Sequence, residues 1–286
     1  MRSRVGILSL FFLLFFHSCA YYSKNYEYFY SHLQSFRPPD KPMVEDDYFL
    51  VLLVDACHLD YTDAAQFFQS VAIHPMNRSR RGDLGHAWIY LQGKLRDGTI
   101  FVLEGGHSGE REAHPPRYFE GLMNYNQWGY ANPSAEDMSN PRYEPNPIKY
   151  LWTIREDGFF QKGSGGHHPS FAAKISLSKK KFEEVLAFIR PSTYPYSCYA
   201  LMGNQCCSFV AHVAGLAGIV LKTKTSMRVS PLIYYGNRWI RLWENPCYSI
   251  LTFATPDILE KSLIEAVQKG RAEYALDWYI RKKLHR

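Results

Sequence analysis

The chain has 286 residues, of which 46% are hydrophobic and 21% charged, and its formal net charge is +6. This composition excludes a disordered or fibrous chain, and the length suffices for one large domain or two small ones. Basic residues cluster at 78–81, 179–181 and 281–286 without forming a stripe interleaved with aromatic residues, so no nucleic-acid partner is expected. These clusters are typical of a solvated surface, with contact to an anionic lipid or polymer as the alternative.

The first 20 residues have the layout of a secretory signal. Arg2 and Arg4 precede an apolar run at 5–16, and small residues follow it. The run is too short for a membrane-spanning helix. We therefore expect an exported protein with a signal peptide at 1–19. Cys19, directly behind the run, further suggests a bacterial lipoprotein signal, in which lipidated Cys19 holds the protein at a membrane of the cell envelope.

Export bears on the remaining cysteines. They number five, so at least one thiol is left over in an oxidising compartment. No C-x-x-C pair is present, and a structural zinc knuckle is not expected. Two of the five are neighbours, which rarely bond to each other because the geometry is strained. The five are Cys57, Cys198, Cys206, Cys207 and Cys247.

The segment behind the signal is a Tyr-rich, then Pro-rich stretch at 20–45, which we interpret as a tether. The folded domain is expected at 46–255. Its first element, 48–56, is a near-continuous apolar run of strand length, consistent with a buried strand. A short helix is predicted at 62–72.

A hairpin follows. Two β-rich runs, 86–91 and 99–103, are joined by a polar segment that contains Asp97 and Gly98, a strong hairpin signal. The stretch at 105–147 is rich in Gly, Pro, Asn and Tyr and indicates a long functional loop.

The rest of the chain mixes strands and helices in segregated order, which predicts the α+β class. Ser178 is the expected cap of one helix and Gly218 the expected stop of another. The last two helices are interpreted as a C-terminal extension at 256–286. Strands are predicted at 148–154, 170–177, 232–235, 239–243 and 249–253, and helices at 179–189, 205–217, 256–269 and 273–284.

The helix predicted at 205–217 carries the strongest chemical signal. Asn204 is a favoured N-cap residue, which places Cys206 in the first turn. There the unsatisfied backbone N–H groups and the helix dipole favour a thiolate and can receive an oxyanion. Core packing is the alternative, because Cys206 shares an apolar face with Phe209 and Val213. Cys207 is predicted to be structural.

The pattern N-Q-C-x-S-F-V-x-x-V-x-x-x-A-G resembles the nucleophile helix of the NlpC-like papain superfamily. It is especially similar to the circularly permuted branch that includes lecithin:retinol acyltransferase-like proteins. In that branch Phe-Val follows the nucleophile at +3 and +4, which selects Cys206 over Cys207. The catalytic His of the branch lies upstream, at the start of a strand, and G-H-A-W-I-Y-L supplies His86. The family's Asn-Cys dipeptide is interrupted here by Gln205.

The resemblance also implies a third polar residue on the next strand, opposite the histidine. If the hairpin turn is centred between residues 96 and 97, His86 pairs with His107. A turn centred on 97–98 shifts the partner by two and leaves His107 on the same face. A neutral His107 would hold His86 in the right tautomer, and Glu104 is the competing candidate.

The resemblance thus implies a permuted papain-like domain in which Cys206 attacks an amide or ester carbonyl and His86 moves the proton. Asn204 and Gln205 are expected to support the substrate or the oxyanion. A cell-wall peptide and a lipid acyl bond are the candidate substrates, with water or another molecule as acceptor. Neither a cofactor nor a metal is expected.

Two rival functions stay open. One is a non-catalytic envelope lipoprotein that keeps the fold for binding. The other is a metal-dependent hydrolase, for which Asp55, His58 and Asp60 are candidate ligands, although they do not share one strand face. His167 and His168, after K-G-S-G-G, line a pocket rim or cap a strand.

Overall fold

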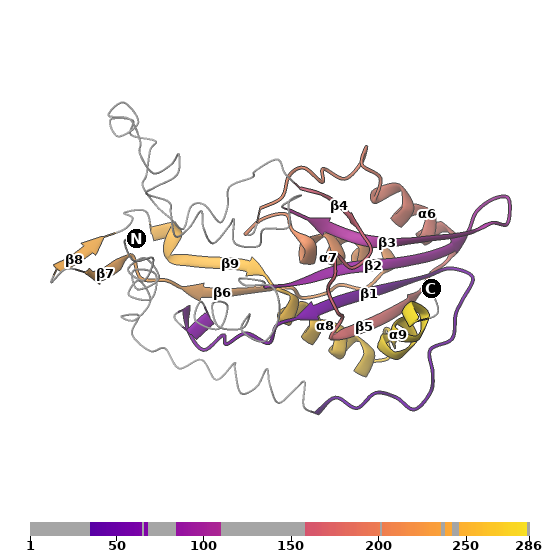
Figure 1. Ribbon diagram of the computed structural model, residues 1–286, viewed down its shortest axis with the longest axis horizontal. Helices are drawn as coiled ribbons and strands as arrows, with labels where there is room; N and C mark the ends of the chain where they lie inside the picture. Colours follow the sequence, from indigo (N-terminus) through magenta and orange to yellow (C-terminus); the bar gives the residue numbers. More distant parts are fainter. Residues whose placement is uncertain are drawn as a thin grey trace, which may run out of the picture.

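A six-stranded antiparallel sheet, in the order β10-β5-β1-β2-β3-β4, forms the centre of the molecule (Figure 1). This computed structural model describes residues 35–64, 66–67, 84–109, 158–200, 202–235, 238–241 and 246–284. Together with its helices the sheet confirms the α+β class. The strands are β1 (Phe49–Ala56), β2 (Gly85–Lys94), β3 (Ile100–Ser108), β4 (Phe159–Lys162), β5 (Phe171–Ser176) and β10 (Glu273–Tyr274).

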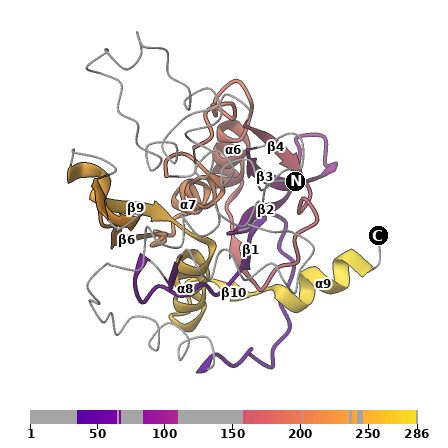
Figure 2. The ribbon, with the colours of Figure 1, turned by 60° about the vertical axis from the view of Figure 1, so that its left-hand side comes forward.

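Helices cover both faces of the sheet. α6 (Lys179–Phe188), α7 (Cys206–Ala217) and α8 (Pro256–Gln268) pack on one face, and α9 (Leu276–Leu284) packs on the other (Figure 2). The segment predicted as a C-terminal extension therefore supplies part of the core on each side.

Strand β1 is buried on both faces, which explains its continuous apolar run. Leu50, Leu52 and Val54 point into the core beneath α7 and α8. The alternate residues Phe49 and Leu53 point into the core beneath α9. A strand with this burial must be central, and β2 and β5 flank it.

The helix ends follow capping rules. Ser178 caps α6 by accepting a hydrogen bond from the Lys181 amide, and Gly218, at φ 98°, ends α7, both as predicted. Thr255 caps α8, with Pro256 in the first helical position.

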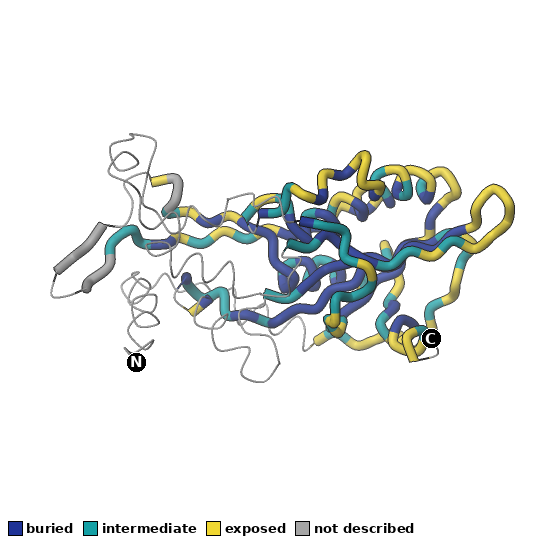
Figure 3. Tube along the Cα trace, turned by 45° about the horizontal axis from the view of Figure 1, so that its top comes forward, coloured by how far each residue is buried: buried dark blue, intermediate teal, exposed yellow. Residues whose placement is uncertain are grey.

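Two ribbons extend from one end of the sheet (Figure 1). Strand β6 (Lys224–Arg228) pairs with β9 (Ile250–Ala254), β7 (Leu232–Tyr235) pairs with β8 (Arg238–Arg241), and the 3-10 helix η3 (Pro246–Ser249) precedes β9. Buried and exposed residues alternate along the β6–β9 ribbon, which is less uniformly buried than the dark core of Figure 3. Strands β4, β6 and β10 were not predicted, because each is short or lacks an apolar alternation.

Several predictions fall outside the described residues: the signal, Cys19, the start of the tether, the strand at 148–154, and most of the 62–72 helix and of the 105–147 loop. Residues 105–108 of that loop belong to β3. In the described part of the chain, no helix has the length and apolar character to cross a membrane.

The predicted hairpin exists, but its register is wrong by one residue. Leu95 and Thr99 close a three-residue loop, with Gly98 in the left-handed region at φ 85°. Both registers considered from the sequence assumed a turn centred between two residues. A three-residue loop centred on Asp97 instead gives pairs that sum to 194, such as Ile89 with Gly105.

Candidate active site

Cys206 is the first residue of α7, as expected, but its cap is Gln205 and not Asn204. The Gln205 side chain accepts hydrogen bonds from the amides of Cys207, at 2.6 Å, and Ser208. Ser208 Oγ in turn accepts from the Gln205 amide at 2.8 Å. The Gln205 Nε2 group donates to the carbonyl of Ala254 at 2.6 Å, which joins the start of α7 to the start of α8.

Asn204 anchors the loop before α7. Its Oδ1 atom lies 2.7 Å from the hydroxyl of Tyr194 and 3.2 Å from Ser208 Oγ. Neither Asn204 nor Gln205 therefore directs its side chain mainly at a ligand; both hold the turn that presents Cys206.

The Cys206 thiol is buried among polar partners. Its Sγ atom lies 3.9 Å from Cys207 Sγ and 3.3 Å from Gln205 Oε1. The pKa of Cys206 is well below its usual value because the Cys207 thiol stabilises the thiolate, as do the His86 imidazole and the Ala87 amide, while burial opposes them. Cys206 is also part of the core beneath α7, so packing and reactivity coincide at this residue.

His86 is the second residue of β2, and the residue before it fixes the backbone at this position. Gly85 has φ 90°, and a Cβ there would stand 2.1 Å from the Asp55 carbonyl oxygen, so only glycine permits this pairing of β1 and β2. His86 itself is 5% exposed, and its Nε2 atom has no hydrogen-bond partner in the described ranges. A buried unpaired ring nitrogen is costly unless it serves a reacting group.

His167 is the side chain that contacts His86 across the sheet end. Their rings stack at 4.8 Å between centroids, and Trp88 stacks on His86 at 5.8 Å. His167 Nδ1 lies 3.0 Å from Asp55 Oδ2, and Asp55 is the register partner of His86. The sequence singled out both residues but joined neither to His86, because the pairing of β1 with β2 and β5 brings them together and the sequence carries no local signal for it.

His107 does not lie opposite His86, as the sequence had suggested. Continuing the observed register would set it opposite Ala87, on the α7 face, whereas His86 alternates with Ala87 and stacks on Trp88. Its Nε2 donates to the Tyr196 carbonyl at 2.7 Å, and its Nδ1 lies 3.0 Å from the Tyr194 hydroxyl. Burial lowers the pKa of His107, which favours the neutral ring. Both nitrogens are thus engaged with the loop that leads to Asn204.

Glu104 lies on the face covered by α9. Its carboxylate accepts from the Tyr279 hydroxyl at 2.5 Å and pairs with Lys283 at 2.9 Å. It is bonded to the C-terminal helix and is not brought together with His86.

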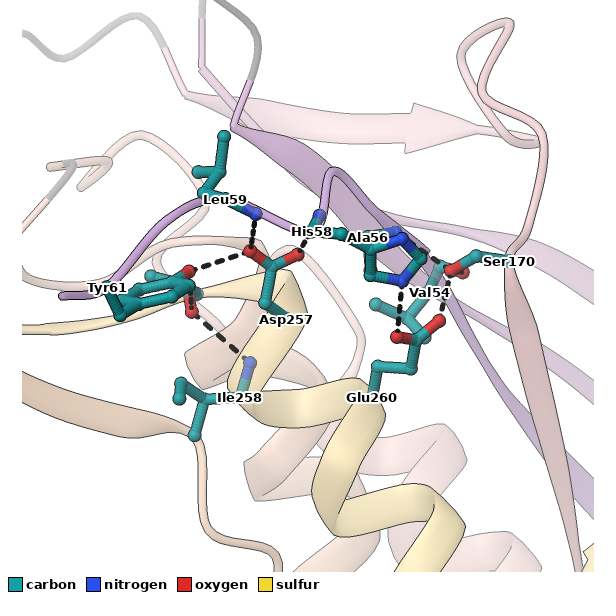
Figure 4. Close-up of polar contacts among 10 residues, drawn as sticks. Val54, Ala56, His58, Leu59, Tyr61, Ser170, Asp257, Ile258 and Glu260 are labelled. Atoms are coloured by element: carbon teal, nitrogen blue, oxygen red, sulfur yellow. Dashed lines mark hydrogen bonds and ion pairs between the residues drawn. The ribbon is translucent and has the colours of Figure 1, made fainter. Parts of the chain in front are cut away.

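A buried carboxylate, that of Asp257, lies close enough to Cys207 for its charge to act on this thiol. Figure 4 shows its hydrogen bonds. Asp257, in the first turn of α8, accepts hydrogen bonds from the amides of His58 and Leu59 and from the Tyr61 hydroxyl, at 2.8 to 2.9 Å. Burial raises its pKa, against the effect of these bonds. One turn further, Glu260 lies 2.8 Å from His58 Nε2. Asp257 and Glu260 therefore fasten the loop after β1 to α8.

The proposed metal ligands Asp55, His58 and Asp60 do not converge. His58 faces Glu260, and Asp55 faces His167. Over the described ranges, no group of three or more His, Cys, Asp or Glu side chains could hold a metal ion. The cysteines whose placement is described, Cys57, Cys198, Cys206 and Cys207, form no disulfide with one another.

Comparison with known proteins assigns no family: no family model, curated protein or solved structure matches the chain. What the fold and the site define is an α+β protein with a buried cysteine at a helix N-terminus beside a strand-borne histidine.

Proposed function

We propose that this protein is a thiol hydrolase or acyltransferase with a permuted papain-like domain, in which Cys206 is the nucleophile and His86 the base. One observation carries the proposal: the His86 imidazole, at the start of β2, is close enough to Cys206 to stabilise its thiolate and helps to hold the pKa of this thiol well below its usual value. The chain order supports it as well, since the histidine strand β2 precedes the cysteine helix α7.

The reaction begins with proton transfer from the Cys206 thiol to His86. The thiolate attacks the carbonyl carbon of an amide or ester, so a C–S bond forms and the carbonyl π electrons move to oxygen. On collapse, the bond to the leaving amine or alcohol breaks, and His86 returns the proton to that group. Water or another acceptor, deprotonated by His86, then attacks the acyl-thioester and releases Cys206.

The oxyanion has one evident donor at the start of α7. The Gln205 side chain accepts hydrogen bonds from the amides of Cys207 and Ser208. The Cys206 amide is the N–H group of the first turn that this cap does not bind. The helix dipole adds to its effect on developing negative charge.

We assign the role of orienting His86 to His167 and Asp55. The stacked ring of His167 restricts rotation of His86, and the Asp55 carboxylate fixes His167 in turn. His107, with Tyr194, orders the loop before Cys206. Glu104 has no part in the reaction.

Alkylation of the purified chain with iodoacetamide across pH, read by peptide mapping, tests the thiolate. We expect Cys206 to react selectively, with a midpoint well below the value of about 8.5 for an ordinary thiol. His86→Gln should raise the midpoint, because the thiolate loses its imidazole partner.

Cys198, which is half-buried, is the internal control in the same molecule. If Cys206 reacts no faster than Cys198 at any pH, the nucleophile assignment is wrong.

A further inference from the structure

Cys207 is a buried thiol that the proposed reaction does not use. It is fully shielded from solvent in the second position of α7, and its amide is fixed by Gln205 Oε1 at 2.6 Å. Within the described chain, the hydrogen-bond partner of its thiol is Cys206 Sγ, at 3.9 Å. The Cys207 side chain therefore points at the sulfur of the proposed nucleophile from within the protein.

We propose that Cys207 is a positioning residue that donates its S–H toward Cys206 Sγ and stabilises the attacking thiolate. This inference rests on the proposed function, and it gives the second cysteine of the pair a role beyond core packing.

The direction of the hydrogen bond follows from the charges around the pair. Burial raises the pKa of Cys207, and the charges of Cys206 and Asp257 raise it further. The Asp257 carboxylate, whose charge acts on Cys207, is held in place by hydrogen bonds from the His58 and Leu59 amides (Figure 4). Negative charge is therefore disfavoured on Cys207, which stays a thiol and a donor.

The groups around Cys206, in contrast, favour a negative charge on its sulfur. His86 of β2 and the Ala87 amide stabilise its thiolate. A single negative charge on the pair is therefore located on Cys206 Sγ, since Cys206 is the less buried of the two residues. The titratable groups that face the pair are His86 from β2, His107 from β3, Asp257 from α8, Tyr61 from the loop after β1 and Tyr194 from the loop before α7.

Two substitutions of nearly equal size separate donation from packing. Cys207→Ala removes the donor together with the γ atom, whereas Cys207→Ser keeps an O–H donor at that position, and both residues are smaller than cysteine by a similar volume. We expect the pH midpoint of Cys206 alkylation to rise by about one unit or more in Cys207→Ala, a loss of about tenfold in reactivity on the acidic side. Cys207→Ser should restore most of it. A packing role would shift both variants alike.

The outcomes are separable. If wild-type Cys206 is selectively reactive and the two variants share the wild-type midpoint, or shift equally, the role of Cys207 is refuted while the nucleophile stands. If wild-type Cys206 is unreactive, the proposed function itself fails. Circular dichroism and thermal unfolding confirm that the variants compared are folded, and the thiolate absorbance of the wild type gives the midpoint without any substitution.

Discussion

His167 stacks on His86, and Asp55 binds the Nδ1 atom of His167. Removal of the His167 ring would therefore free the imidazole of His86 to rotate. A general base must keep its geometry toward the nucleophile to be effective. The effect of His167 is therefore expected on the rate and not on the fold, because the residue lies in the loop before β5 and outside the strands.

We predict that His167→Ala lowers kcat/KM for an activated phenyl ester by about 10- to 100-fold, and that Asp55→Asn lowers it less. His168→Ala is the matched control, since this exposed neighbour has no part in the stack. Equal rates for His167→Ala and His168→Ala would show that the stack does not orient the base.

The residues of the site differ in how far the sequence could predict them. Cys206 and His86 belong to local patterns, and their positions at a helix start and a strand start follow from those patterns. His167 and Asp55 come together only through the pairing of β1 with β2 and β5, which no local pattern encodes. His107 was joined to His86 by an assumed two-residue turn.

At the scale of elements, the start of α7 depends on one side chain. Gln205 is long enough to accept from two amides and still donate to Ala254 across to α8. Asn204, the residue favoured by cap statistics, is one position too early and is bound to Tyr194. Cap preference therefore located the helix start only to within a residue.

We predict that Gln205→Ala lowers the free energy of unfolding by about 1–2 kcal/mol, because two amides and one carbonyl lose their partner. Urea unfolding measures the change. Ser178→Ala, which removes the cap of α6, is the comparison: it should also destabilise the chain but leave Cys206 alkylation unchanged. No loss of stability in Gln205→Ala would contradict the capping assignment.

The hairpin register shows where element-level prediction ends. Asp97 and Gly98 correctly marked a turn, but a left-handed glycine is compatible with loops of two or three residues. One additional loop residue moves every partner of β2 by one and exchanges the two faces. A side-chain pairing across two strands cannot be fixed without that loop length.

At the scale of the molecule, the site forms where the starts of β2, α7 and α8 meet at one end of the sheet (Figure 1). The helices after residue 255 are needed for it: α8 supplies Asp257, whose charge acts on Cys207, and α9 covers the opposite face. Hydrophobic runs and helical spacing sufficed to predict the class, because they report local burial. Sheet order depends on distant segments and could not be read from them.

The central claim is that an acyl group passes through Cys206 with the help of His86. The most direct measurement is intact mass and peptide mapping after brief exposure of the chain to an activated phenyl acetate. We predict one acetyl group per chain, located on Cys206 and released over time, and its loss in Cys206→Ser and His86→Gln. Acetylation that is spread over lysines, or that persists at the same level in Cys206→Ser, would contradict the account.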